Sequence, residues 1–320
     1  MTPPSDTLLR IGTRGSRLAL WQAERVAALL RARHPHVRTE IVPIASHGDL
    51  HGQAVADLGT VGIFTREIEQ ALLDGQVDVA VHSLKDLPTE APAALTIAAL
   101  LPRDDPRDVL VAGALVGGSF ASGRAALAAL PPRARLATSS LRRRAELLRA
   151  RGDVEVVELR GNVPTRLAKV ERGEVDGVVL SLSGLLRLGL EPPGRVPLEP
   201  ELMLPAPAQG TIAVQVRADD GRTRPLVAAL DDAPTRVCTT AERLLLHELE
   251  GGCRVPLGAL ATLRGDAVTL RARLSAADGT QLLEETAIGS ASALPELAQR
   301  MAAAFRARGA AAILATLRPR

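Results

Sequence analysis

The sequence predicts an α/β protein with parallel-dominated sheets and a separate C-terminal α+β domain. Short β-branched runs alternate with amphipathic helical patterns over about the first two thirds of the chain, which is typical of parallel sheets covered by helices. From Ala233 onward the order changes to one helix, three strands and a long alanine-rich helix. At 320 residues, 46% of them hydrophobic, the chain is too long for one core of ordinary size.

The N-terminal part begins with a strand–helix–strand pattern. The apolar run LLRIGT predicts a strand at 8–13, helical periodicity follows at 17–33, and VRTEIVPI predicts a second strand at 37–44. After a glycine-bearing loop, a helix is expected at 64–75 and a buried strand at 77–83, where VDVAVHS is almost continuously apolar.

A stretch rich in Pro, Asp and Arg at 101–111 indicates a crossing between two lobes. A second set of alternating elements follows it. Its strands are expected at 135–139, 154–160 and 175–181, and its helices at 141–152 and 164–173. The proline-rich segment at 191–208 interrupts this rhythm, and TIAVQVR at 211–217 returns to strand.

Cysteine usage and apolar runs indicate the compartment. The two cysteines, Cys238 and Cys253, form no CxxC pair and no Cys/His cluster, which argues against a disulfide scaffold or a structural zinc site. His47 and His51 in a Gly/Asp loop are weak candidates for a metal site, and no metal is expected. No run has signal-peptide or bilayer-spanning character, so we expect a soluble, unexported protein in a reducing cytoplasm.

Cys253 lies in LEGGCRVPLG at 249–258, the loop between the first helix and first strand of the C-terminal domain. A glycine pair before a cysteine frees the backbone and can display the thiol on a loop for covalent chemistry. The segment alone favours a different interpretation, a small buried hydrophobe. A thiol hydrolase would also need an activating histidine, for which His247 is the candidate.

Arginine dominates the basic residues: of 39, only Lys85 and Lys169 are lysines. Three strand-to-helix junctions place arginines beside a capping residue. These are Arg14 before Ser16; Arg142, Arg143 and Arg144 after Ser139 or Ser140; and Arg160 and Arg166 around Asn162 and Pro164. Cations at a helix start oppose its dipole, so three such junctions favour an anion site over solvated surface arginines.

A further candidate site follows the buried strand at 77–83. Lys85 and Asp86 stand directly after this strand, where ligands gather in open α/β sheets. Asp86 is therefore a candidate acid or base, while His82 on the strand can be merely structural. Nucleic acid is not the expected partner, because three Phe, one Trp and no Tyr provide almost no stacking surface.

Together these segments resemble the porphobilinogen deaminase (hydroxymethylbilane synthase) family. The matching pieces, in the family's order, are LRIGTRGSRLALWQAE, SHGD, VHSLKDLP, DDPRD, TSSLRRR, LRGNVPTRL, SGLLRLGL, AQG, AERLLL and LEGGCRVP. The resemblance implies two lobes like those of a type II periplasmic binding protein, with the active site in the cleft between them, and a third domain. The implied boundaries are 7–106 with 210–228 for domain 1, 107–205 for domain 2 and 232–320 for domain 3.

The resemblance also implies the chemistry. Cys253 would carry a dipyrromethane cofactor through a thioether, and four porphobilinogen molecules would be joined head to tail with loss of ammonia to give hydroxymethylbilane. Asp86 matches the catalytic aspartate, which would also contact the cofactor and stabilise the cationic azafulvene. The residues matching those that hold cofactor carboxylates are Lys85, Ser140, Arg142, Arg143 and Arg160, and those matching substrate-binding residues are Arg14, Ser16, Arg160, Arg166 and, more weakly, Arg187. Gln209 matches a structural or hinge residue.

The chain departs from the family pattern at three positions. Asp57 and Val61 replace two lysines usual in the loop at 48–64, which puts that loop's substrate binding in doubt, and Ala208 replaces a glycine. The expected partner is porphobilinogen, with no nucleic acid and no membrane, and the expected state is a cytoplasmic monomer. A non-enzymatic anion-binding module with two similar lobes is the alternative from another class.

Overall fold

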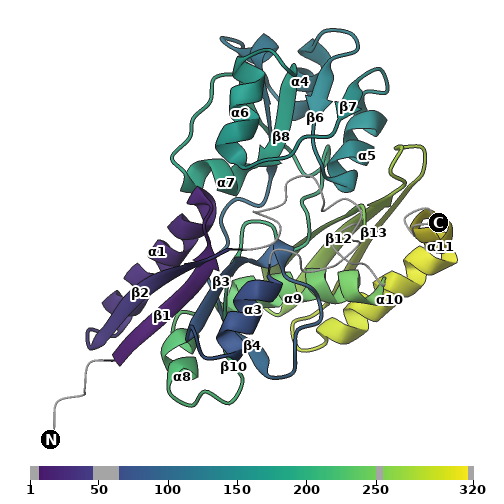
Figure 1. Cartoon of the computed structure of the whole chain (residues 1–320). Coiled ribbons are helices and arrows are strands. Elements are labelled where there is room, and N and C mark those ends of the chain that lie inside the picture. The colour runs from purple at the N-terminus through teal and green to yellow at the C-terminus, as the bar shows by residue number, and fades with distance from the viewer. Residues whose placement is uncertain (1–6, 46–64, 250–254, 316–320) are drawn as a thin grey trace, which may run out of the picture. The chain divides into compact units, whose positions relative to one another are not determined.

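The computed structural model describes residues 7–45, 65–249 and 255–315, and Figure 1 labels its helices and strands. The chain divides into two compact units, Met1–Arg103 with Thr211–Arg236 and Asp104–Gly210 with Val237–Arg320. The last of these boundaries falls inside helix α9. The three domains expected from the sequence remain a prediction, since this division gives two units.

The first unit is built on a five-stranded mixed sheet. Its elements are β1 (Thr7–Arg14), α1 (Arg17–Arg33), β2 (Val37–Ile44), α3 (Arg66–Leu73), β3 (Val79–Ser83), the 3-10 turn Leu84–Asp86, β4 (Leu95–Leu100), β10 (Ile212–Arg217) and α8 (Thr223–Ala228). The strand order is β2-β1-β3-β10-β4. β1 is parallel to β2 and β3, and β10 is antiparallel to both its neighbours. Four of the five strands therefore run in one direction.

Helix α1 shows why the sequence predicted this unit well. Its buried positions Ala23, Val26, Ala27 and Leu30 recur at helical spacing, and they pack on the apolar face of β1 and β3. Ser16 caps the helix by accepting a hydrogen bond from the Ala19 N–H at 3.3 Å. Both signals are local, so the predicted helix and the strand after it match α1 and β2 in full.

The second unit repeats the same strand arrangement. Its first elements are β5 (Asp108–Ala112), the 3-10 turn Gly113–Leu115, α4 (Gly123–Ala129), β6 (Arg135–Ala137), α5 (Leu141–Ala150), β7 (Glu155–Val157), α6 (Val163–Glu171), β8 (Gly177–Ser181), α7 (Leu182–Arg187) and β9 (Arg195–Leu198). The order is β7-β6-β8-β5-β9, with β6 parallel to β7 and β8, and β5 antiparallel to both neighbours. The mixed α/β class with parallel-dominated sheets is confirmed.

The C-terminal part of the second unit has its own sheet and core. It contains α9 (Ala233–Glu248), which begins in the first unit, followed by β11 (Leu257–Arg264), β12 (Ala267–Ser275), β13 (Leu282–Ser290), α10 (Leu294–Ala307) and α11 (Ala310–Ala315). The three strands form an antiparallel sheet against which α10 packs, with Phe305 and Met301 in the core (Figure 1). A separate C-terminal α+β region is therefore confirmed.

Two sequence predictions need correction. The final helix is not continuous: it breaks at Arg308 and Gly309, where Gly309 has φ +94°, a conformation that favours glycine. The stretch at 101–111, predicted as a crossing, already contains the first residues of β5. The short strands β4 and β9 and the helices α4, α7 and α8 were not predicted, because short runs carry little periodicity.

Ala208 adopts the left-handed conformation, with φ +63°, and is fully buried. Its N–H donates to the Glu242 carboxylate at 2.6 Å, which helps hold this backbone in place. Because a Cβ disfavours left-handed backbone, we expect Ala208→Gly to raise the free energy of unfolding by up to about 1 kcal/mol, the strain relief exceeding the entropy cost of glycine. Urea unfolding checks this, and a destabilised variant would contradict it.

Candidate active site

A pocket in the first unit collects polar side chains from the ends of two neighbouring strands. It is lined by Arg14, Ser16, Leu18, Ala19, Gln22, Thr65, Val81, His82, Ser83 and Asp86. Arg14 ends β1, and Ser83 ends β3 just before the turn that carries Asp86. Because β1 and β3 are parallel neighbours, their carboxyl ends lie at the same edge of the sheet. The pocket is therefore where an open α/β sheet binds ligands.

The pocket combines an exposed carboxylate with a cation and the start of a helix. Asp86 is exposed in its 3-10 turn, and Arg14 is partly buried beside the N-terminus of α1. Lys85 is partly buried in the same turn as Asp86 but does not line the pocket. This arrangement can bind an acidic group near Arg14 and the helix start while presenting Asp86 to a cation or an N–H donor.

Gln22 and Ser83 join the helix side and the strand side of the pocket. The Gln22 Nε2 donates to the Ser83 Oγ at 2.9 Å, and Gln22 is buried. Gln22 is a polar residue on the apolar face of α1, beside Ala23 and Val26. Neither residue was predicted from the sequence, although a polar residue on an otherwise apolar helix face is a signal that could have indicated Gln22.

His82 lies on β3 and is neutral at physiological pH. Burial lowers its pKa to about 4, which a hydrogen-bond contribution from Gln215 opposes only in part. Its Nε2 is buried, and none of the residues that the structure describes forms a hydrogen bond with it. His82 therefore resists protonation, and its protonation would destabilise the fold.

We expect the protein to lose stability as the pH falls from about 6.5 to about 4 because of His82. In this window His82 of the unfolded chain, with its ordinary pKa of 6.5, takes up a proton, whereas His82 of the folded chain does not. The loss is up to about 3 kcal/mol, since each pKa unit is about 1.4 kcal/mol. Denaturant unfolding of His82→Leu should show a flatter dependence on pH across this window. The partly exposed His36→Gln is the control, and an unchanged slope in His82→Leu would refute the assignment.

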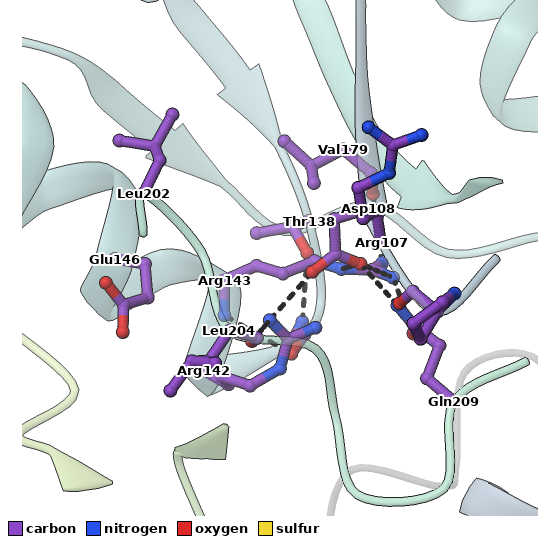
Figure 2. Close-up of polar contacts among 12 residues, drawn as sticks. Arg107, Asp108, Thr138, Arg142, Arg143, Glu146, Val179, Leu202, Leu204 and Gln209 are labelled. Carbon is purple, nitrogen blue, oxygen red and sulfur yellow. Dashed lines mark hydrogen bonds and ion pairs between the residues drawn. The ribbon is translucent and has the colours of Figure 1, made fainter. Parts of the chain in front are cut away.

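A second cluster of charged side chains is buried in the second unit, around the carboxylate of Asp108 (Figure 2). The Arg143 Nη2 lies 2.8 Å from the Asp108 Oδ1, and the Arg142 Nη1 lies 2.7 Å from Oδ2. The Asp108 side chain is 0% exposed, against 4% for Arg142 and 9% for Arg143. Both arginines belong to the first turn of α5, which Ser140 caps.

The partners around Asp108 explain its protonation state. Burial alone would raise the pKa of Asp108, but the charges of Arg142 and Arg143 hold it well below its ordinary value. The Gln209 Nε2 adds a hydrogen bond of 2.9 Å to the Asp108 Oδ1 and donates to the Pro106 carbonyl at 2.7 Å. Asp108 is thus a buried carboxylate that stays ionised.

The sequence predicted a bound anion at the start of α5. In the structure, a carboxylate of the chain itself, that of Asp108, lies there. One carboxylate is shared by two guanidiniums, and the Nε of Arg142 is buried without a hydrogen-bond partner among the described residues. The pKa of Arg166 is lowered by burial and then by the charge of Arg143. Crowded, partly desolvated cations of this kind fit a ligand that carries carboxylates.

The other predicted arginines differ in their surroundings. Arg160 is exposed and pairs with Glu158 at 3.2 Å, while Arg166 donates to the Gly161 carbonyl at 2.8 Å. Arg187 is buried, and its guanidinium binds the Asp104 carboxylate at 2.7 Å and the Gly210 carbonyl at 2.6 Å. Arg187 therefore links Asp104, which lies shortly before β5, to Gly210, which lies shortly before β10.

The chain matches two family models in succession. Residues 9–225 match the porphobilinogen deaminase dipyromethane cofactor binding domain, and residues 236–307 match the porphobilinogen deaminase C-terminal domain. A porphobilinogen deaminase of Xanthomonas euvesicatoria is 46% identical over 312 residues, which cover 97% of this chain and 100% of the relative. One from Syntrophotalea carbinolica is 44% identical over 314 residues, covering 98% and 97%. The chain belongs to the porphobilinogen deaminase family.

Solved structures with a similar fold include two binding proteins. The BenM effector binding domain with benzoate has a TM-score of 0.42 and 17% identity over 71% of this chain and 90% of that one. The periplasmic sulfonate-binding protein SsuA from Methylobacillus flagellatus has a TM-score of 0.38 and 14% identity over 75% and 69%.

The structure brings the predicted porphobilinogen deaminase residues together in two groups. Arg14, Ser16 and Asp86 line the pocket of the first unit, and Arg142 and Arg143 meet at Asp108 in the second. Several predictions fall on residues outside the described ranges. These are Cys253, Asp57, Val61, His47 and His51. Cys238 is partly buried and packs against the C-terminal core.

The described residues contain neither a candidate metal cluster nor a candidate membrane-spanning helix. Within residues 7–45, 65–249 and 255–315, no group of three or more His, Cys, Asp or Glu side chains could hold a metal ion. In the same part of the chain, no helix has the length and apolar character needed to cross a membrane.

Proposed function

We propose that this chain joins four porphobilinogen molecules head to tail, releasing one ammonia per addition, to give hydroxymethylbilane. The observation that carries the proposal is the position of Asp86 in a pocket with Arg14 and Ser16, in a chain matched by the family over nearly its whole length. Porphobilinogen offers an aminomethyl group, a pyrrole N–H and two carboxylates. A pocket with one carboxylate and a nearby guanidinium suits these groups.

Asp86 is the proposed catalytic residue. Each addition breaks the carbon–nitrogen bond of the aminomethyl group, and the amine leaves as ammonia after taking up a proton. The positive charge left on the substrate spreads to its pyrrole N–H. The Asp86 carboxylate would accept a hydrogen bond from this N–H and stabilise the developing cation. When the new carbon–carbon bond has formed, the displaced ring proton leaves, and Asp86 is placed to assist its transfer.

The arginines would bind the acidic side chains of the substrate and the growing product. Arg14 and the start of α1 would orient the substrate carboxylates, and Arg142, Arg143, Arg160 and Arg166 would hold those of the cofactor and chain, with Lys85, Ser140 and Arg187 as further candidates. The dipyrromethane, attached through Cys253, supplies the pyrrole carbon to which the first substrate is joined. Hydrolysis would later release the product while the attachment stays intact.

Intact-mass spectrometry of the purified protein tests the proposed function. We expect an adduct of dipyrrole size on the wild-type chain, absent from Cys253→Ser, and bilane formation from porphobilinogen only when the adduct is present. Cys238→Ser is the matched control, because it removes the other thiol and should keep the adduct. An unmodified wild-type chain that still makes bilane would refute the role of Cys253.

Arg160→Leu should lower the rate of elongation about tenfold, because a charge-assisted hydrogen bond to a carboxylate contributes about 1.5–3 kcal/mol. Arg172→Leu is the matched control. Both arginines flank α6 and form an exposed ion pair with a glutamate two residues away, Glu158 and Glu174 respectively. Surface pairs of this kind contribute at most about 1 kcal/mol to stability, so both variants should fold. Equal elongation rates in the two variants would remove Arg160 from the binding site.

We also propose a cytoplasmic monomer. The two cysteines form no CxxC pair in the sequence, which fits a reducing compartment, since disulfides are rare there. Size-exclusion chromatography with light scattering measures the oligomeric state, and a dimer mass would contradict the proposal.

A further inference from the structure

A second buried ion pair joins helix α5 to the C-terminal sheet within the second unit. The Arg273 Nη1 on β12 lies 3.0 Å from the Glu146 Oε2 on α5, and their side chains are 3% and 1% exposed. Arg273 also binds Glu284 on β13, with its Nη2 at 2.8 Å from the Oε2. Removing one partner of this pair takes away part of the charge compensation of the other, buried partner, which is unfavourable.

Each member of this pair also binds a second charged side chain, Arg149 for Glu146 and Glu284 for Arg273. Arg149, one turn further along α5, donates to the same Glu146 Oε2 at 3.0 Å. Burial alone would raise the pKa of Glu284, but hydrogen bonds from Arg273 and Arg271 lower it. The pair is therefore part of a hydrogen-bonded ionic network rather than an isolated contact.

Backbone packing brings the same two elements into close contact. At Gly279, in the turn between β12 and β13, a Cβ would lie 2.9 Å from the Ala145 carbonyl oxygen and 3.1 Å from the Arg149 nitrogen. The turn thus rests directly on the backbone of α5. The close packing of this turn on α5 leaves no room for a side chain at position 279.

A second contact reaches the start of α5. At Gly258 on β11, a Cβ would lie 2.7 Å from the Leu204 Cβ and 2.9 Å from the Leu204 oxygen. That same oxygen accepts the hydrogen bond of 2.5 Å from the Arg142 Nη1. The C-terminal sheet therefore contacts Leu204, whose carbonyl binds Arg142, and through Arg273 it also binds Glu146, one turn further along α5.

We propose that the Glu146–Arg273 bridge is a positioning pair: through it the C-terminal sheet fixes the first turn of α5, and with it the two guanidiniums that share Asp108. The pair touches no ligand itself. Its effect on catalysis rests on the proposed function, in which those guanidiniums bind carboxylates of the growing chain. Its effect on α5 does not depend on that function.

Hydrogen exchange and kinetics of four variants of the full-length protein test this proposal. Arg273→Gln and Glu146→Gln should speed amide exchange in residues 141–147 and raise the KM for porphobilinogen about tenfold, with kcat changed less than about threefold, since small displacements of binding groups are costly. Glu146→Gln/Arg273→Gln should be no worse than either single variant, because the two changes remove one shared interaction.

Arg271→Gln is the matched control. Arg271 lies on β12 two residues from Arg273 and binds the same Glu284, but its other partner is Glu201, not a residue of α5. It should leave exchange in α5 and the KM unchanged even where it lowers the thermal midpoint. Equal effects of Arg271→Gln and Arg273→Gln on exchange would overturn the proposal, as would wild-type exchange in both single variants. If the glutamine variants do not fold, Arg273→Lys applies the same criteria.

The proposed function and the positioning role of the Glu146–Arg273 pair can fail separately. If the wild-type chain carries no adduct and makes no bilane, the proposed function falls, while the exchange measurement still decides the role of the pair. If the adduct and activity are present but exchange in α5 does not respond to Arg273→Gln, only the positioning role falls.

Discussion

Asp86→Asn is expected to lose nearly all bilane formation while keeping the fold and the covalent cofactor. Asp86 is exposed in a 3-10 turn at the pocket edge, so an isosteric amide there costs little stability. The amide has no negative charge to stabilise a developing cation and cannot accept a proton. Loss of a group with these two roles lowers kcat by about 100-fold to 10,000-fold.

Single-turnover kinetics with porphobilinogen measure this effect, and intact mass confirms that the cofactor is present. Asp219→Asn is the control, because it makes the same change at another exposed aspartate of the first unit. A variant with normal kcat and a raised KM would show that Asp86 only binds the substrate, which contradicts the proposed role in the rate. Near-normal turnover would remove Asp86 from the site altogether.

The parts of the site that were predicted from the sequence depend on local signals. Ser16, Ser140 and Asn162 each cap the helix that follows, through a hydrogen bond to a backbone N–H three residues ahead. A capping residue before an amphipathic run is visible in a single sequence. The position of Asp86 after a buried apolar strand is visible for the same reason.

The parts that were not predicted depend on contacts between distant residues. Asp108 pairs with Arg143 across 35 positions, and Gln209 reaches Asp108 across 101. In the sequence, Asp108 is one acid in a stretch that also contains Asp104 and Asp105. Only the fold decides which of the three is buried against the arginines, so the sequence predicted a bound anion at α5 but not the carboxylate of Asp108.

Asp108→Asn is expected to lower the free energy of unfolding by about 3–5 kcal/mol, the range for breaking one partner of a buried ion pair. The amide leaves Arg142 and Arg143 buried without a carboxylate between them. Denaturant unfolding measures the change. Asp105→Asn is the matched control, because its partner Arg107 is 41% exposed, and such pairs contribute at most about 1 kcal/mol. Equal losses in the two variants would show that burial does not increase the contribution of the Asp108 ion pairs to the free energy of unfolding.

The pH dependence of this variant has a definite sign. Because the folded-state pKa of Asp108 lies below its ordinary value of 3.8, its stabilisation is present above pH 3.8 and is lost as the pH falls below it. The wild-type chain should therefore destabilise in acid below pH 3.8 more steeply than Asp108→Asn. This window lies below the one assigned to His82, so the two groups can be distinguished in one titration.

The cofactor should change the size of the Asp108 effect. If carboxylates of the bound dipyrromethane pair with Arg142 and Arg143, they compensate part of the charge that Asp108→Asn leaves behind. In a Cys253→Ser background, without the cofactor, the same substitution should therefore cost at least about 1 kcal/mol more, a coupling typical of groups that share partners. Equal costs in the two backgrounds would mean that the cofactor does not reach these guanidiniums.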